Sequence, residues 1–304
     1  MPGGGLVGAA TGGITLAQAL VGICDGRLNY VSTTQIAFER YRGNNIEVNG
    51  ELVSIGASGL ACNTTDNLIS ATGTDSGGAM AAGASYHIYV SNASATYAAS
   101  SCRGSSTAPT SFNGARYLGT SGNAANWRYV GAARTIAGPE FVDSITQRLV
   151  LSWYHRLHKP IFSSPGYTDN NSNTTYTSAS QVWEAVNGGG GSRLSFMANG
   201  EDQVEIKIFG VANHDAAGTT FRLALGIDVV TTATVQSASK ENTEGDEEAQ
   251  SASYNWVPGE GIHTVDLLTS TGGAGPSVLW YADDVRQGGT SDGVLTGITG
   301  SVWV

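Results

Sequence analysis

Short segments that alternate apolar and polar residues fill the second half of the chain, and they constrain its fold more than any other feature. They recur at intervals of roughly ten residues with turn residues between them, which is typical of a β-sandwich or barrel. Charged residues are 13% of the chain and glycines number 42, a composition that suits strands and turns better than solvated helices. The segments are RLSFMAN (193–199), QVEIKIFGVAN (203–213), TFRLALGIDVV (220–230), ATVQSAS (233–239), GIHTVDLLTS (261–270), SVLWYADD (277–284) and VLTGITGSVWV (294–304).

The first half shows the same β character with a clear hairpin. Asn49-Gly50 joins residues 46–48 to residues 51–55, and this dipeptide supplies the positive φ angles of a type I′ turn. Residues 143–158 contain the run LVLSWY, and we expect one long strand there that leads out of the first domain.

A proline-containing, Asn/Ser/Thr-rich segment separates the two halves. We therefore predict an all-β protein with two β domains. The predicted divisions are a Gly-rich N-terminal arm (1–26), an N-terminal β domain (27–158), a linker (159–180) and a C-terminal β-sandwich (181–304). The arm is either flexible or becomes ordered by threading onto a neighbouring subunit.

Charge and hydropathy exclude two classes of partner. The net charge of −10 argues against nucleic acid, which needs a basic stripe, and equally against an anionic membrane surface. No apolar run reaches the ~20 residues that cross a bilayer, so we predict no membrane insertion.

The three cysteines form no complete disulfide framework. Cys24, Cys62 and Cys102 are an odd number and widely spaced. We expect buried free thiols, with a Cys62–Cys102 bridge as the alternative.

No motif in the chain supports an enzyme, a cofactor or a metal. Gly3, Gly5 and Gly8 match a dinucleotide motif without a preceding strand. The G-x-S-x-G at 289–293 lacks the flanking strand and helix of a nucleophile elbow, and the D-x-N-x-N at 169–173 lacks the Gly and Glu of an EF-hand. We predict no catalytic, cofactor-binding or metal-binding residues.

Several ordered motifs resemble a module of tailed-bacteriophage virion proteins, of the head fibre, decoration and tail fibre kinds. In the first half these are YHIYV (86–90), STAPT (106–110), RYLGT (116–120), WRYVGAART (127–135) and QRLVLSWYHR (147–156); in the second, LALGID (223–228), EGIHTVDLL (260–268) and LTGITG (295–300). The resemblance implies an all-β, oligomeric virion component whose C-terminal domain is a jelly-roll-like β-sandwich. It does not separate head from tail.

Two groups of residues are candidates for contacts. Arginines with aromatics are enriched at interfaces, so the central stretch supplies predicted interface residues: Trp127, Arg128, Arg134, Phe141, Arg148 and Trp153. Later in the chain lie Trp256, Trp280, Tyr281 and Trp303. We expect these to fill cores or interfaces, and the alternative is that Trp256, Trp280 and Tyr281 contact a glycan.

The sequence therefore predicts a non-enzymatic phage structural protein located on the virion. It would decorate or project from the particle as a homo-oligomer, which we expect to be a trimer, bound to other virion proteins of the capsid or tail. The alternative is a module at a fibre or spike tip that binds a host surface glycan.

Overall fold

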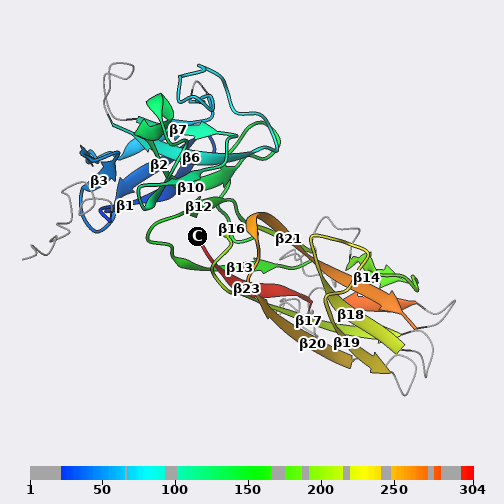
Figure 1. The fold of residues 1–304 in the computed structure, drawn as a ribbon. Coiled ribbons are helices and arrows are strands. Elements are labelled where there is room, and N and C mark those ends of the chain that lie inside the picture. The colour runs from blue at the N-terminus through cyan, green and yellow to red at the C-terminus, as the bar shows by residue number, and fades with distance from the viewer. Residues whose placement is uncertain are drawn as a thin grey trace, which may run out of the picture.

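The chain forms an almost entirely β structure, described by a computed structural model (Figure 1). The structure describes residues 22–65, 67–92, 101–165, 175–186, 192–214, 220–240, 248–272, 277–281 and 296–304. The one helical element named within these ranges is the short 3₁₀ helix η1, Gly122–Asn126. The predicted all-β fold class is confirmed.

The N-terminal body holds three sheets. Their orders are β1-β2-β5, β3-β4 and β7-β6-β10-β9-β8, with β12 also pairing with β10. The strands are β1 (Gly26–Ser32), β2 (Gln35–Arg40), β3 (Asn45–Val48), β4 (Glu51–Ser54), β5 (Leu60–Asn63), β6 (Ser85–Ser91), β7 (Ser101–Ser105), β8 (Thr110–Phe112), β9 (Ala115–Tyr117), β10 (Trp127–Arg134), β11 (Gln147–Arg148) and β12 (Val150–Ser152).

The predicted hairpin at Asn49-Gly50 is present between β3 and β4. Both turn residues have positive φ, 50° at Asn49 and 87° at Gly50, as a type I′ turn requires.

The predicted arm ends earlier than residue 26. Residues 1–21 lie outside the described residues, but Cys24 forms a bridge with Ile46, and the Glu47 N–H donates to the Ile23 carbonyl at 3.0 Å. The boundary at residue 26 is therefore wrong, because the backbone of residues 23–25 finds its partners in the first β body.

Alternation along β6 divides the N-terminal core between two faces of its sheet. Tyr86, Ile88 and Val90 join the larger cluster with residues of the β1-β2-β5 sheet, whereas Tyr89 packs in a smaller cluster with Trp127. All three cysteines are buried and free, as predicted, and the alternative Cys62–Cys102 bridge is absent.

A buried ion pair ties the hairpin to the large sheet. Arg128 Nη1 lies 2.7 Å from Glu47 Oε2, and their side chains are 2% and 1% exposed. Arg128 Nε and Nη2 donate to the Tyr154 hydroxyl, while Tyr117 OH and the Gly50 N–H donate to the Glu47 carboxylate. Every charge in this network is compensated, which is the condition for keeping ions inside a core.

Removing the cation from this network is expected to be costly. Arg128→Met leaves the Glu47 carboxylate buried without its partner and should lower the free energy of unfolding by about 3–5 kcal/mol, measured by urea denaturation. Arg134→Met is the control, because Arg134 is a partly exposed side chain that bonds Ser85, and its change should stay within about 0.5 kcal/mol. Equal losses in the two variants would contradict the assignment.

The C-terminal body is built from nested antiparallel pairs. Taken from the inside outward, β18 pairs with β19, β17 with β20, β16 with β21, and β13 and β14 with β23 and β22. The strands are β13 (His158–Ser163), β14 (Thr175–Ser178), β15 (Glu184–Ala185), β16 (Arg193–Asn199), β17 (Val204–His214), β18 (Thr220–Ile227), β19 (Val235–Lys240), β20 (Glu248–Trp256), β21 (Glu260–Thr271), β22 (Val278–Tyr281) and β23 (Gly297–Trp303).

This nesting produces two facing sheets with the strand connectivity of a jelly roll. One sheet has the order β13-β23-β17-β22-β14, with β20 on the other side of β17; the second has the order β11-β16-β21-β18-β19, with β15 beside β21. Such a wrapped long hairpin is the jelly-roll topology. The predicted jelly-roll-like sandwich is therefore confirmed.

The jelly-roll core follows the alternation in the sequence. Val204, Ile206 and Ile208 on β17 all point into one cluster that also contains Trp280. Gly210 continues the row, where an added Cβ would lie 2.8 Å from Trp280 Cζ3. A glycine here lets the indole ring lie directly on the strand.

The predicted linker, residues 159–180, is partly wrong. Residues 158–163 form β13, which pairs along its whole length with β23, and residues 175–178 form β14. Pro160 is compatible with β13 because this strand lies at a sheet edge, where a missing N–H costs little. The long strand expected at 143–158 is also wrong: it is divided into β11 and β12, and His155 has φ of 55°.

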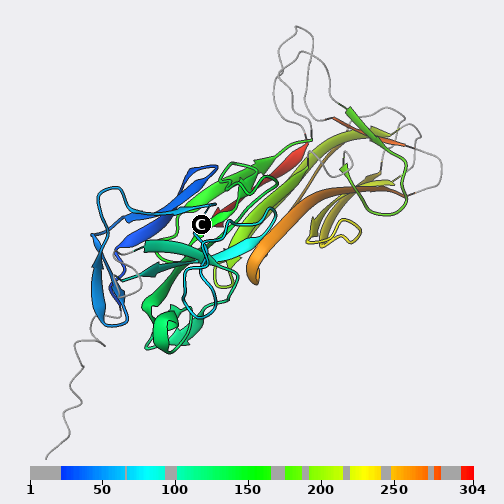
Figure 2. The ribbon, with the colours of Figure 1, turned by 90° about the horizontal axis from the view of Figure 1, so that it is seen from above.

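The two bodies lie end to end and are tied together at several points (Figures 1 and 2). Strand β11 pairs in parallel with β16, and the Phe162 N–H of β13 donates to the Ile145 carbonyl at 3.0 Å. Arg156 Nε lies 2.8 Å from Asp202 Oδ2. The two bodies are thus connected by hydrogen-bonded strands and an ion pair, and not by a free linker.

Arg116 completes this junction from the N-terminal body. Its guanidinium lies 4.4 Å from the ring centroid of Trp153 and 4.9 Å from that of Tyr129, and it forms a 3.0 Å ion pair with Glu260 of β21. A cation over two aromatic rings that also reaches a carboxylate joins three strands at one point.

His87 beside this cluster predicts acid sensitivity. Its Nδ1 is buried with no hydrogen-bond partner among the described residues, and burial lowers the pKa of His87. Because the pKa is lower in the folded than in the unfolded state, the unfolded chain takes up a proton first as pH falls below about 6.5, and stability decreases. The urea concentration at the unfolding midpoint should be lower at about pH 5 than at about pH 7.5. The difference between the two pH values should be smaller in His87→Gln. Identical falls would show that other groups are responsible.

Candidate binding sites

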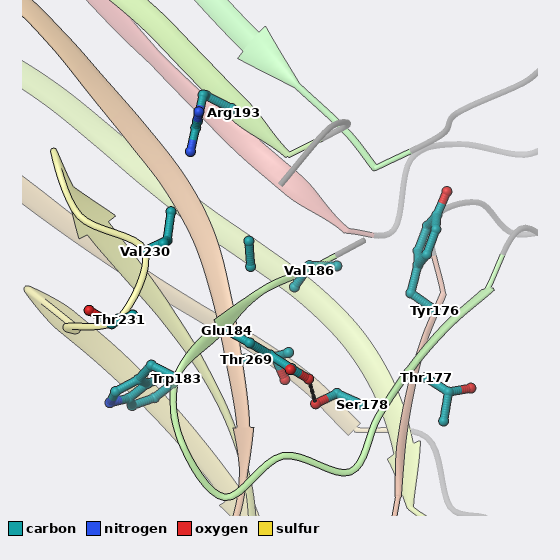
Figure 3. Close-up of a pocket in the computed structure, with 11 residues that line it drawn as sticks. Tyr176, Thr177, Ser178, Trp183, Glu184, Val186, Arg193, Val230, Thr231 and Thr269 are labelled. Carbon is teal, nitrogen blue, oxygen red and sulfur yellow. Dashed lines mark hydrogen bonds between the residues drawn. The ribbon is translucent and has the colours of Figure 1, made fainter. Parts of the chain in front are cut away.

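A groove around Trp183 lies in the jelly roll (Figure 3). Its main part is a pocket of about 710 Å³, and an adjoining pocket of about 390 Å³ shares Trp183 and Thr231 with it. The indole therefore lines both pockets. Pockets of this size match those that hold small ligands.

The groove lies where edge strands of the two sheets approach each other. Tyr176 and Ser178 come from β14 of one sheet, Glu184 from β15 of the other, and Arg193 from the start of β16. Thr231 belongs to the segment after β18. With Thr269 of β21, five parts of the chain meet around one pocket, which no local sequence motif could reveal.

The two charged side chains of the groove are held by hydrogen bonds. Arg193 Nε donates to Asp266 Oδ1 at 2.8 Å, and Asp266 is fully buried whereas Arg193 is 44% exposed. The Ser178 hydroxyl donates to the Glu184 carboxylate, as drawn in Figure 3. Both side chains are oriented before any ligand arrives.

This set of groups suits the binding of a ligand. A flat indole surrounded by hydroxyl, carboxylate and guanidinium groups can stack on a sugar ring and bond its hydroxyls. Glycoside hydrolysis needs two carboxyl groups across a cleft, and Glu184 is the one carboxylate among the described lining residues.

Of the residues proposed to contact a glycan, Trp280 is excluded. It is completely buried, and its Nε1–H donates to Thr269 Oγ1 at 2.7 Å, so the glycan alternative is wrong for this residue and the predicted core position is correct. Trp256 is half-buried and packs on Phe196, with ring centroids 6.2 Å apart. Tyr281 OH accepts from Asn213 Nδ2 at 2.8 Å.

These three residues do not form one site. Trp280 pairs with Ala212 and Trp256 with Val204, which places them opposite positions eight residues apart on β17. At about 3.3 Å per residue the two positions are separated by roughly 26 Å.

The predicted interface residues also divide. Trp127, Arg128 and Phe141 are 0%, 2% and 0% exposed inside the chain, so the prediction that they contact another subunit is wrong. Arg148 bonds Asp143, and Trp153 lies between Arg116 and Arg156 at the junction. An intersubunit role for Arg134, Arg148 and Trp153 stays a prediction.

Sequence reasoning missed Trp183. The signal was its setting, a single tryptophan between a Ser/Thr-rich segment and the run of glycines at 188–191, where no alternation places it in a core. Polar, turn-rich surroundings predict that a large aromatic side chain lies at the protein surface and not in the core.

The described residues offer no metal site. Among the described residues there is no group of three or more His, Cys, Asp and Glu side chains that could hold an ion. The motifs at 3–8, 169–173 and 289–293 lie outside the described residues. Within the described ranges, no helix is long and apolar enough to span a membrane.

Comparison with known proteins identifies no family. No family model and no curated protein matches the chain. The solved structures that are similar include those of the infectious bursal disease virus Gt strain, Gx strain and VP2 subviral particle. They are 10%, 10% and 11% identical, with TM-scores of 0.26, 0.23 and 0.22. The matches cover 62%, 91% and 91% of this chain and 50%, 70% and 74% of those chains.

The chain thus spans about half the length of the Gt strain protein. TM-scores this low carry no argument for a shared fold or function.

Proposed function

We propose that this protein is a non-enzymatic structural component of a bacteriophage virion that decorates or projects from the particle. The observation that carries the proposal is the junction, where strand pairing and ion pairs fix a jelly roll to a second β body without a free linker. Such a two-part rod holds its far end at a set distance from whatever binds its near end. The sequence resemblance to phage head fibre, decoration and tail fibre modules supports the same role.

Self-association fits the surface of the described chain. Exposed apolar side chains are spread over both bodies, among them Tyr41, Leu52, Ile145 and Val182, and few lysines or glutamates separate them. A homotrimer attached to other virion proteins remains our proposal for the assembled form.

Location on the particle tests the proposed function directly. Antibodies raised against the purified chain should label intact particles of the phage that encodes it, seen by immunogold electron microscopy. Labelling absent from particles but present in lysates of infected cells would overturn the proposal.

Light scattering tests the assembly. The full chain and a variant lacking residues 1–21 should both have three times the chain mass, because the described β bodies would supply the contacts. A variant cut at residue 26 is unsuitable, since Ile23 and Cys24 pair with the first β body. A monomeric mass for both proteins would contradict the trimer.

A second function, contact with a host surface glycan, is favoured by the groove around Trp183. Trp183→Ala should weaken binding of the host's surface polysaccharide at least about tenfold in titration calorimetry, because it removes the stacking surface. Val182→Ala is the matched control, because Val182 is the neighbouring residue and is 72% exposed. Equal binding by the two variants would exclude the groove.

A further inference from the structure

The outer face of the jelly-roll sheet that contains β13, β23, β17 and β20 carries a separate hollow near the junction. This pocket of about 310 Å³ is lined by His158, Gln203, Glu205, Asn255, Ser301 and Trp303. It lies on β13, β23, β17 and β20, whereas the groove around Trp183 involves β14, β15 and β16.

Strand alternation and register build this hollow. Val302 and Val304 are buried, so the side chain of Trp303 between them points to the outer face, where it is 40% exposed. Ser301 pairs with Glu205, and Glu205 pairs with Asn255, which sets three polar side chains in one row across the sheet.

An aromatic platform borders this row. Trp303 pairs with His158 on the neighbouring strand, and their ring centroids lie 4.9 Å apart at an interplanar angle of 41°. The indole and imidazole rings are therefore in contact at the edge of the hollow. The platform stands next to the row of amide, carboxylate and hydroxyl groups.

The polar groups of this row are not engaged within the described chain. No side-chain hydrogen bond or ion pair of the described structure involves Gln203, Glu205, Asn255 or Ser301. Their donors and acceptors are available to a ligand, on a rigid sheet that fixes their spacing.

We propose that this face binds a neutral saccharide, with a pyranose ring on Trp303 and its hydroxyls on Glu205, Asn255 and Ser301. A sugar ring presents an apolar C–H face and a rim of hydroxyls, which matches a ring platform beside short polar side chains. The carboxylate of Glu205 can accept from two hydroxyls, and its charge disfavours an anionic sugar.

A protein partner fits this face less well. Protein interfaces enrich aromatics, Met and Arg and deplete Lys, Glu and Ser. The outward positions beside Trp303 instead carry Glu205 and Ser301, and the next row along these strands carries Lys207 and Ser253. The inference goes beyond the proposed function, because it does not depend on the Trp183 groove or on the location of the protein.

The experiment titrates the full chain with neutral maltohexaose, cellohexaose and N-acetylchitohexaose, and with anionic oligogalacturonate, by saturation-transfer NMR and calorimetry. At least one neutral probe should bind, and the anionic probe should not. Trp303→Ala should weaken that binding at least about tenfold, and Trp183→Ala should change it less than about twofold. The Glu205→Gln variant should fold normally and should bind the same neutral probe more weakly.

Each other outcome overturns the site. Absence of binding by all neutral probes excludes it, as does preferred binding of oligogalacturonate. Loss of binding in Trp183→Ala alone would assign the sugar to the groove and support the second proposed function. A lower oligomeric mass of Trp303→Ala in light scattering, with sugar binding unchanged, would make this face a contact between copies of the chain.

Discussion

The pairing of β17 on both of its edges determines the rest of the jelly roll. One edge pairs with β20 over nine residues, and the other pairs first with β23 and then with β22. Because side chains alternate along a strand, one register error here would turn the apolar row of Val204, Ile206 and Ile208 toward solvent. Gly210 and Trp280 reinforce this register, since the indole occupies the space that a Cβ at position 210 would need.

The N-terminal body depends on a different kind of constraint. Its buried Arg128 and Glu47 do not gain stability from charge alone, because desolvation opposes their attraction. What the pair specifies is position: a hairpin, a sheet strand and Tyr154 must all be in place before every charge has its partner. Tyr154 belongs to the segment that continues to the junction, so the same network that orders the hairpin also orders the exit toward the jelly roll. Burial raises the pKa of Tyr117 to about 12 and raises that of Tyr154, so both phenols are neutral near pH 7, where Tyr117 donates to Glu47 and Tyr154 accepts from Arg128.

Local and periodic features of the fold could be predicted from the sequence, whereas features that depend on distant partners could not. The turn at Asn49-Gly50 and the strands of the jelly roll follow from backbone preferences and alternation. The linker was mispredicted because Pro160 was taken as a strand breaker, although it occupies an edge strand. Arg128 was mispredicted because its partner Glu47 lies 81 residues earlier, and composition cannot distinguish an arginine paired in a core from one at an interface.

The tryptophans show how far the candidate sites could have been found in advance. In the segment SVWV the valines are buried, so alternation alone turns Trp303 outward, and this could be derived without coordinates. In VLWY the same rule places Val278 and Trp280 on one face, and both are buried, which removes Trp280 from any surface role. Trp183 lies outside a long alternating run, so the alternation of side chains along a strand does not predict its direction. Its groove is formed only where edge strands of both sheets come together. Strand parity therefore separates structural aromatics from surface aromatics within regular strands, while sites made by irregular segments require the fold itself.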